Sequence, residues 1–502
     1  MTKKWWLFVV AGSLIIGIFL FLRFYALTNL PVFADEAIYI RWAQVMRAEP
    51  TLRFLPLSDG KQPLYMWMVI PFLKIISDPL VAGRLLSVLS GLGIILGIGV
   101  ISWYLFRSKK VTLITTLLWA LSPYSVFFDK MALVDSLLAF FCIWTFIFAM
   151  FTANTLRLDM AMITGFFLGG ALLTKSPALF MAVLLPSFFL FTGFKFKKMV
   201  KLLGLYLATL AIGYGMYNIL RLGPNFNMIA SRNYDYVFPF SHLWLNPRDP
   251  FIFLVPKFLD WIWKMGPFPI MFLGLLGLTV NFRKYFSKIT ILLLWFIFPI
   301  LVQAMFAKVF TARYIYFCMP FLFILAGSVL LVKTKLIRIA SILLIVLGIG
   351  ISLWFDHWLL SDITQANLPR SERSGYLEEW SAGQGIKQVA NFIEEQYLAN
   401  HKTIVVGTEG YFGTLPDGLQ AYLNKYSGII VIGVGLNFDK LPKSLVESNA
   451  AGNPTYLVVN SDRFDGNAFK QGLNLLASYP KAIAPDGKQE SLLFFKLGRA
   501  TP

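Results

Sequence analysis

Apolar residues come in long runs separated by short polar segments from the start of the chain to about residue 355. A membrane-spanning helix needs roughly 20 mostly apolar residues, so these runs predict about eleven spanning helices. The predicted spans are 5–24, 81–106, 111–128, 132–155, 159–174, 177–194, 200–220, 266–280, 289–307, 314–332 and 336–355.

The apolar segment 64–77 is short and contains Pro71 and Lys74, so we expect it to lie in the membrane interface without crossing. With Lys3 and Lys4 in the cytoplasm, the basic loops that follow then all face the cytoplasm, as the positive-inside rule requires. These loops are 107–110, 154–157, 195–201, 283–288 and 333–338. If 64–77 were counted as a span, most of these basic loops would face the outside of the membrane instead.

The pattern changes after residue 355, where long apolar runs stop. Short β-branched or apolar runs at 403–407, 428–433, 455–459 and 491–495 alternate with helical stretches at 386–400 and 442–449. Alternating strands and helices are typical of an α/β domain. We therefore predict a polytopic α-helical membrane protein with a transmembrane domain, 1–355, and a soluble extracytoplasmic α/β domain, 356–502.

The composition agrees with a membrane protein, since 57% of the residues are hydrophobic and only 14% are charged. The net charge of +19 could suggest nucleic acid, but the Lys and Arg residues are explained by cytoplasmic loops, and we expect no nucleic-acid partner. Cys142 and Cys318 both lie in apolar segments, which indicates neither a disulfide nor a thiolate metal site. We expect an integral protein of the plasma (inner) membrane.

Two adjacent carboxylates, Asp35 and Glu36, stand where the first apolar run has ended and one membrane face begins. A carboxylate near hydrocarbon is costly, so it is by default a candidate site residue. The alternative is that the pair is simply solvated in a loop. Asp135 interrupts an otherwise apolar run on the same face, and a lone Asp there needs a partner.

Cations are expected on this face as well. Lys61 lies in the same outer loop as Asp35, and Lys175 and Arg313 mark the ends of later spans. The alternative for Lys175 and Arg313 is that their side chains reach the lipid head groups and have no further role. Asp129, next to Lys130, could be no more than a solvated loop charge.

Carboxylates and cations at one membrane depth suit transfer from a lipid-linked phosphate. Cations hold the phosphate and stabilise it as it departs, while a carboxylate takes the proton of an acceptor hydroxyl. Asp35 and Asp135 could share a divalent cation such as Mg or Mn, or a carboxylate pair with a nearby Lys could work without one, so no cofactor is certain. A transporter or lipid flippase is the alternative, but it would need charges at mid-membrane and repeated helices.

Several short motifs occur in a characteristic order. They are Asp35-Glu-Ala-x-Tyr39, Lys61-x-Pro-Leu-Tyr65, Ala82-Gly-Arg-Leu-Leu-Ser87, Asp135 after Ser122-Pro123, Leu173-Thr-Lys-Ser-Pro177 and Arg313-Tyr314. In this order the chain resembles the GT-C glycosyltransferases over roughly residues 1–355. Within them it is most similar to the branch of protein O-mannosyltransferases and lipid A aminoarabinose transferases.

The resemblance implies transfer, with inversion, of mannose or a related sugar from a polyprenyl-phosphate-sugar donor. The acceptor would be a hydroxyl of a protein, lipid or glycan at the outer membrane face. Asp35 matches the first-loop Asp that acts on the acceptor as base or orienting group, and Asp135 matches the second-loop Asp. Lys61 matches the Lys of a Lys-Pro-Pro motif associated with the donor phosphate, although the motif here reads Lys-Gln-Pro.

Further residues are predicted to bind substrate. Arg84 matches an Arg of the second span, and Tyr376 lies in a stretch, 373–385, that could contact a sugar or acceptor or could simply be a turn. The full set of predicted substrate-binding residues is Glu36, Lys61, Tyr65, Arg84, Lys175, Arg313 and Tyr376.

Overall fold

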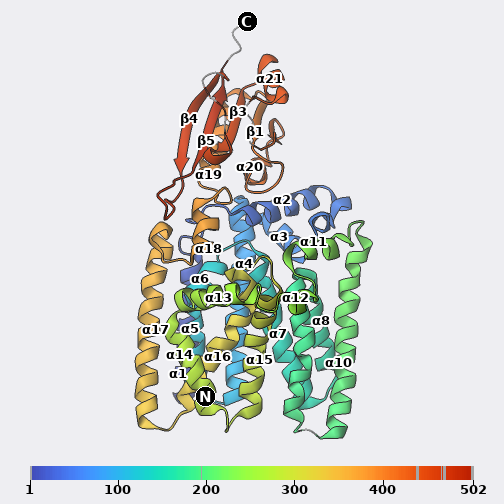
Figure 1. Ribbon diagram of the computed structural model, residues 1–502, viewed down its shortest axis with the longest axis vertical. Coiled ribbons are helices and arrows are strands. Elements are labelled where there is room, and N and C mark those ends of the chain that lie inside the picture. The colour runs from blue at the N-terminus through green and yellow to red at the C-terminus, as the bar shows by residue number, and fades with distance from the viewer. Residues whose placement is uncertain are drawn as a thin grey trace. The chain divides into compact units, whose positions relative to one another are not determined.

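The computed structural model describes residues 3–193, 195–436, 440–464, 466, 468 and 471–498. The chain forms two compact units (Figure 1). The helical unit comprises Met1–Leu27, Thr51–Met68 and Arg84–Pro369, and the mixed unit comprises Thr28–Pro50, Val69–Gly83 and Arg370–Pro502. The mixed unit thus includes two segments from the N-terminal part of the chain. The division into domains 1–355 and 356–502, drawn from composition, stays a prediction.

Helices make up the chain from α1 to η8. The longer ones are α1 (Lys3–Phe24), α4 (Pro79–Phe106), α7 (Val134–Thr155), α8 (Leu158–Thr174), α10 (Phe196–Tyr217), α15 (Phe286–Phe306) and α17 (Lys335–Ser361). Shorter helices are α3 (Leu64–Ile75), α5 (Lys109–Ala120), α6 (Pro123–Phe128), α9 (Leu179–Leu184), α11 (Met228–Tyr236), α12 (His242–Leu245), α13 (Phe251–Met265), α14 (Phe268–Asn281) and α16 (Met319–Ser328). Short 3-10 segments are η1 (Pro50–Leu52), η2 (Leu55–Asp59), η3 (Ser176–Ala178), η4 (Leu185–Thr192), η5 (Asn218–Leu222), η6 (Ala312–Cys318), η7 (Val329–Leu331) and η8 (Ile363–Gln365).

Seven helical stretches of the described chain are long and apolar enough to cross a membrane, or eight if the bent pair α13 and α14 is one span. The chain is therefore an integral membrane protein by the length and composition of its helices. The predicted count of eleven is not confirmed. The predicted span 111–128 breaks between α5 and α6, and the predicted span 159–174 falls in α8, a helix of 17 residues. The predicted span 177–194 is divided among η3, α9 and η4 as far as Thr192, and residue 194 lies outside the described residues. The two helices α13 and α14 meet at 104°.

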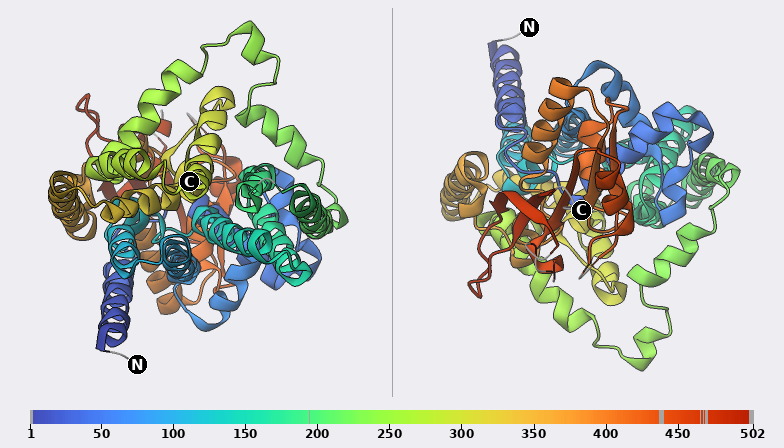
Figure 2. Two further views of the ribbon diagram at one scale, coloured as in Figure 1. Left: turned by 90° about the horizontal axis from the view of Figure 1, so that it is seen from below. Right: turned by 90° about the horizontal axis from the view of Figure 1, so that it is seen from above.

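Small residues allow close helix contact in the helical unit, where α8 packs against both α7 and α10 (Figures 1 and 2). A Cβ on Gly165 would lie 2.8 Å from Ile212 of α10, and one on Gly170 would lie 2.3 Å from Phe141 of α7. Such glycines let helix backbones approach where no hydrophobic effect drives association within a bilayer. The position of α8 fixes that of its last residues, which precede Lys175.

The mixed unit is built on a five-stranded sheet of order β2-β1-β3-β5-β4. Its strands are β1 (Ile404–Thr408), β2 (Ile429–Gly433), β3 (Thr455–Asn460), β4 (Leu473–Pro480) and β5 (Ser491–Leu497). Its helices are α2 (Ala34–Ala48), α18 (Arg370–Arg373), η9 (Ser374–Glu378), α19 (Ile386–Asn400), α20 (Asp417–Leu423), α21 (Lys443–Ala450) and η10 (Ser461–Arg463). Strand β1 runs parallel to β2 and β3, and β5 runs antiparallel to β3 and β4. The α/β prediction is confirmed, although strand β4 was not predicted.

Helix α2, which carries the Asp35-Glu36 motif, packs against α20 within the mixed unit. Arg41 Nε donates to Gln420 Oε1 at 3.1 Å, and Gln44 Nε2 donates to the Ala421 carbonyl at 2.9 Å. This segment, which follows the first predicted span, is therefore part of the mixed unit.

Candidate active site

Asp135 and Lys175 form an ion pair in the helical unit, with 2.7 Å between Asp135 Oδ1 and Lys175 Nζ. Asp135 lies in the first turn of α7, where the helix dipole favours an anion, and its side chain is only 2% exposed. Lys175 directly follows α8 in extended conformation. The structure therefore brings two of the predicted site residues together, and the lone Asp has the partner that the sequence required.

Tyr314 joins this pair to a third predicted residue. The Lys175 ammonium lies 4.3 Å from the centre of the Tyr314 ring, and the Arg313 guanidinium lies 5.5 Å from the same ring. Cations are attracted to the face of an aromatic ring within about 6 Å. Segment η6 thus holds an aromatic ring that contacts two cations beside a buried carboxylate.

Lys61 takes part in a second charged group, which also includes two residues that the sequence did not single out. Lys61 Nζ lies 3.3 Å from Asp59 Oδ2, and an Arg232 nitrogen lies 3.4 Å from Asp59 Oδ1. Gly60 has a φ of +66°, and a Cβ there would lie 2.5 Å from the Arg232 side chain. The turn at Gly60 thus allows α11 to bring Arg232 close to Lys61. Arg232 lies in α11, and no motif marked it in the sequence.

Tyr65 and Arg84 are buried and bonded within the helical unit. Tyr65 Oη and Ser87 Oγ are 3.0 Å apart, which ties α3 to α4. Arg84 donates to the Leu27 carbonyl at 2.7 Å. Both side chains therefore form hydrogen bonds inside the helical unit.

The region next to Asp135 carries more buried charge than the sequence suggested. Asp129 is completely buried, so its interpretation as a solvated loop charge is wrong. Burial raises the pKa of Asp129 to about 6, although Arg23 and hydrogen bonds from Tyr316 and Ser136 oppose that rise. Burial, together with nearby cationic groups, lowers the pKa of Lys130 to about 7.

In the mixed unit, Asp35 and Glu36 occupy the first turn of α2. Glu36 Oε2 accepts a hydrogen bond of 3.0 Å from the Phe33 backbone N–H, which is one half of a capping box. The Tyr376 ring lies 4.3 Å from the Phe33 ring, and the Ala34 N–H donates to the Ser381 carbonyl at 3.1 Å. The stretch after Arg373 thus holds the start of α2, and Tyr376 is 4% exposed.

The predicted site residues are divided between the two units. Asp135, Lys175, Arg313, Lys61, Tyr65 and Arg84 belong to the helical unit, while Asp35, Glu36 and Tyr376 belong to the mixed unit. The convergence of Asp35 with the others stays a prediction, as does a divalent cation shared with Asp135. Among the described residues, no group of three or more His, Cys, Asp or Glu side chains could hold a metal ion.

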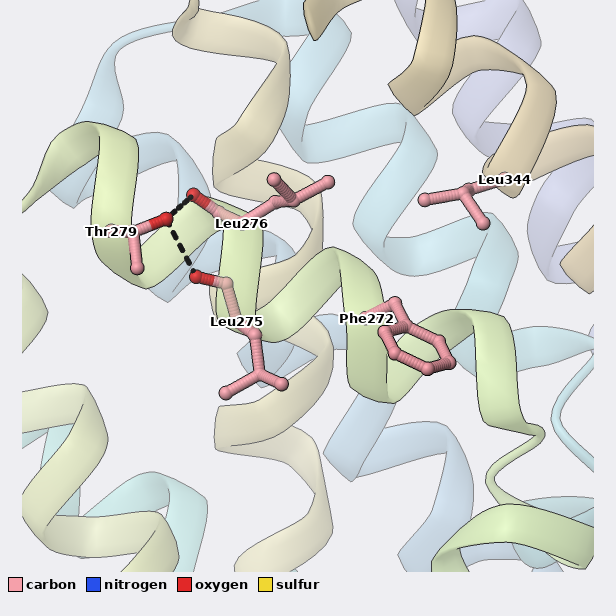
Figure 3. A pocket seen from close by; sticks show the side chains of 5 residues that line it. All are labelled: Phe272, Leu275, Leu276, Thr279 and Leu344. Atoms are coloured by element: carbon pink, nitrogen blue, oxygen red, sulfur yellow. Dashed lines mark hydrogen bonds between the residues drawn. The ribbon is translucent and has the colours of Figure 1, made fainter.

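An apolar groove of about 440 Å³ lies between α14 and α17 (Figure 3). It is lined by Phe272, Leu275, Leu276, Thr279 and Leu344. The Thr279 hydroxyl donates to the carbonyls of Leu275 and Leu276, so the one polar side chain of this lining is satisfied within its own helix. None of the candidate site residues lines this groove.

Comparisons with known proteins agree with this fold. Residues 60–214 match the family model described as dolichyl-phosphate-mannose-protein mannosyltransferase, and no curated protein matches the sequence. ArnT from Cupriavidus metallidurans in the apo state superposes with a TM-score of 0.60 at 16% identity, covering 98% of each chain. The same protein bound to undecaprenyl phosphate gives 0.57 at 15% identity, again with 98% of each chain covered.

A third similar structure is the oligosaccharyltransferase AglB from Archaeoglobus fulgidus, in complex with an inhibitory peptide and a dolichol-phosphate. The two structures superpose with a TM-score of 0.51 at 12% identity. The match covers 98% of the present chain and 74% of the AglB chain. The family-model match includes Lys61, Tyr65, Arg84, Asp135 and Lys175. The chain thus has the GT-C fold of these membrane glycosyltransferases, and its residues 60–214 carry the sequence pattern of the mannosyltransferase model.

Proposed function

We propose that this protein is a membrane glycosyltransferase that moves a sugar, mannose or a related one, from a polyprenyl-phosphate-sugar donor to a hydroxyl acceptor with inversion. The observation that carries the proposal is the meeting of Lys61 and Arg232 at Asp59, from two separate segments of the helical unit. Two convergent cations are what a phosphodiester needs at the end of a lipid tail. ArnT, which shares the fold, has been solved with undecaprenyl phosphate.

In the proposed reaction the acceptor oxygen attacks the anomeric carbon of the donor sugar. The bond from that carbon to the phosphate oxygen breaks, and the electron pair leaves with the polyprenyl phosphate. Lys61 and Arg232 stabilise the negative charge that develops on the departing phosphate. The acceptor proton passes to a carboxylate as the new bond forms.

Asp35 is the proposed base, and this assignment rests on its motif rather than on a distance. Asp135 is the proposed second carboxylate, which orients the acceptor, and its Oδ1 is held by the Lys175 ammonium at 2.7 Å. Arg313 and Tyr314 would line the same part of the site, since Tyr314 contacts Lys175. The outer membrane face is the proposed location, because the basic loops are expected in the cytoplasm.

The test is a transfer assay with the purified full-length protein in lipid nanodiscs. A panel of radiolabelled polyprenyl-phosphate sugars, with mannose among them, is incubated with the protein and with peptide, lipid or glycan acceptors. Mass spectrometry of the co-purified lipid names the head group that the protein retains. We expect at least one donor to be consumed with release of polyprenyl phosphate, and the proposal is overturned if none of them is.

Two variants test the assigned roles. Asp35→Asn should abolish transfer while the protein remains folded and inserted, and Lys61→Ala should weaken donor binding. Glu395→Gln is a matched control for Asp35→Asn, because it also converts a carboxylate to an amide, at an exposed position of the mixed unit. Turnover near that of the wild type in Asp35→Asn would remove Asp35 from its catalytic role. Unchanged donor affinity in Lys61→Ala would assign that residue to the surface.

A further inference from the structure

The completely buried Asp129 lies between two elements of the candidate site. Tyr316 Oη donates to Asp129 Oδ1 at 2.6 Å, and Ser136 Oγ donates to the same oxygen at 3.1 Å. Ser136 is the residue after Asp135 in α7, and Tyr316 follows Tyr314 by two residues in η6. One carboxylate oxygen therefore links the start of α7 to η6.

The other side of Asp129 faces α1. Arg23 Nε lies 3.5 Å from Asp129 Oδ2, and both side chains are fully buried. Arg23 itself donates to Ser125 Oγ at 2.7 Å and to the Ala120 carbonyl at 2.5 Å. The Arg23 guanidinium is therefore held by α5 and by α6, the helix that Asp129 directly follows, so the carboxylate has little freedom to move.

Packing around Tyr316 restricts this link further. Its ring is parallel to that of Tyr124, with centroids 5.9 Å apart and an interplanar angle of 3°, and it also packs against Trp119 at 5.7 Å. A Cβ on Gly91 of α4 would lie 2.5 Å from the Asp129 carboxylate, so α4 has room for it only because residue 91 is glycine. The carboxylate is confined from four directions, by α1, α4, α7 and η6.

We infer that Asp129 is a positioning residue that fixes the α7 end bearing Asp135 relative to η6, which bears Arg313 and Tyr314. In both α7 and η6, one residue contacts Lys175 and a nearby residue binds Asp129. Asp135 of α7 and Tyr314 of η6 contact Lys175, while Ser136 of α7 and Tyr316 of η6 bind Asp129. This inference rests on the proposed function, because it gives the Asp129 link a purpose in sugar transfer.

The alternative is that the link only stabilises the fold, so the test must separate the two roles. The double variant Tyr316→Phe/Ser136→Ala removes both hydroxyl donors to Asp129. It changes no charged side chain. Tyr206→Phe is the matched control: its buried hydroxyl donates to the Ala149 carbonyl at 3.0 Å and so ties α10 to another part of α7. Both changes remove buried hydroxyls that make hydrogen bonds within the helical unit.

We expect kcat in the double variant to fall about tenfold to 100-fold, because small misplacements of catalytic groups have effects of that order. The donor KM and the binding of polyprenyl phosphate should change less than about twofold, since Lys61 and Arg232 stand on other elements. Tyr206→Phe should leave both constants near those of the wild type.

Hydrogen exchange in nanodiscs gives a readout independent of turnover. In the double variant, exchange should rise at 129–138 and at 312–318 but not at 149–155, whereas Tyr206→Phe should not affect the first two segments. If the wild type consumes no donor, the proposed function fails while the exchange result still tests the link. If the wild type is active and the double variant matches Tyr206→Phe in kcat, the positioning role is overturned.

Discussion

Lys175 Nζ lies 2.7 Å from Asp135 Oδ1, and this contact joins two side chains 40 positions apart in the chain. The Asp135 side chain is 2% exposed and that of Lys175 is 20% exposed, so water screens the pair on one side only. Removing one partner of such a pair leaves a poorly solvated charge, which costs more than the pair itself contributes.

Breaking this pair should therefore destabilise the protein more than removing both charges together. We expect Lys175→Met to lower the free energy of unfolding by about 3 kcal/mol, and Lys175→Met/Asp135→Asn to lower it by less than the sum of the two single changes. Thermal unfolding in nanodiscs measures the four members of this cycle. The control is Lys264→Met, which breaks a pair with Asp260 in which both side chains are more exposed, and which should cost less than about 1 kcal/mol. Additive single effects would show that the pair is not coupled.

Asp59 occupies the position between Lys61 and Arg232 where the donor phosphate is proposed to bind. Because its carboxylate competes with the phosphate for the same cations, Asp59→Asn should tighten binding of polyprenyl phosphate. All three side chains are partly exposed, so the expected gain is about fivefold rather than orders of magnitude. Titration with polyprenyl phosphate, followed by native mass spectrometry, measures it.

Asp159→Asn provides the control for this change, because Asp159 pairs with Arg157 at an exposed position at the start of α8. It should leave lipid-phosphate binding unchanged. Weaker binding in Asp59→Asn would mean that Asp59 orients Lys61 and Arg232 rather than competing with the phosphate.

The parts of this structure that were predictable are those fixed by local pattern and by the cost of buried charge. Asp135 was expected to have a partner because it interrupts an apolar run, and that partner is Lys175. Asp129 was not recognised because its burial depends on residues distant in sequence, namely Gly91, Arg23 and Tyr316. Arg232 was missed for the same reason, since its approach to Lys61 requires the turn at Gly60.

Strand β4 and the number of membrane spans were not predicted correctly from the hydrophobic pattern, for a different reason. Strand β4 lies at the edge of the sheet, and most of its residues are exposed or half-buried, so its apolar positions do not form a recognisable run. The predicted span 111–128 is mostly apolar, but α5 ends at Ala120, and a new helix begins at Pro123 with Ser122 as its N-cap. Hydrophobicity alone does not register such breaks, because proline changes the backbone without changing the apolar character of the run.

Stability of the mixed unit should depend on the ionisation of Asp417. Burial raises the pKa of Asp417 to about 6, although the Gly413 N–H donates to it at 2.8 Å and the Arg41 cation faces it. A carboxyl whose folded pKa exceeds its unfolded value binds more protons when folded, so stability should fall as the pH rises from about 4 to about 6. The free energy of unfolding should change by on the order of 3 kcal/mol at most over this pH range.

Asp417→Asn should flatten that pH dependence, while Asp486→Asn at an exposed loop position should leave it intact. Hydrogen exchange of β1 and β3 at several pH values reports the stability of the mixed unit without requiring the helical unit to unfold. An unchanged slope in Asp417→Asn would assign the pH dependence to another buried group, such as Glu409, whose pKa burial also raises.

Gly91 offers a way to disturb Asp129 without altering any polar group. In Gly91→Ala the new Cβ would lie 2.5 Å from Asp129 Cγ and Oδ2, and the carboxylate cannot retreat without losing Tyr316 or Ser136. Overpacking of this kind costs about 1–3 kcal/mol, and we expect kcat to fall as it does when both hydroxyl donors are removed. Gly99→Ala in the same helix is the control, because its Cβ would meet only Thr116 at an ordinary 3.6 Å. Since alanine favours a helix over glycine, Gly99→Ala should be neutral or stabilising, and equal behaviour of the two variants would show that Asp129 has room to move.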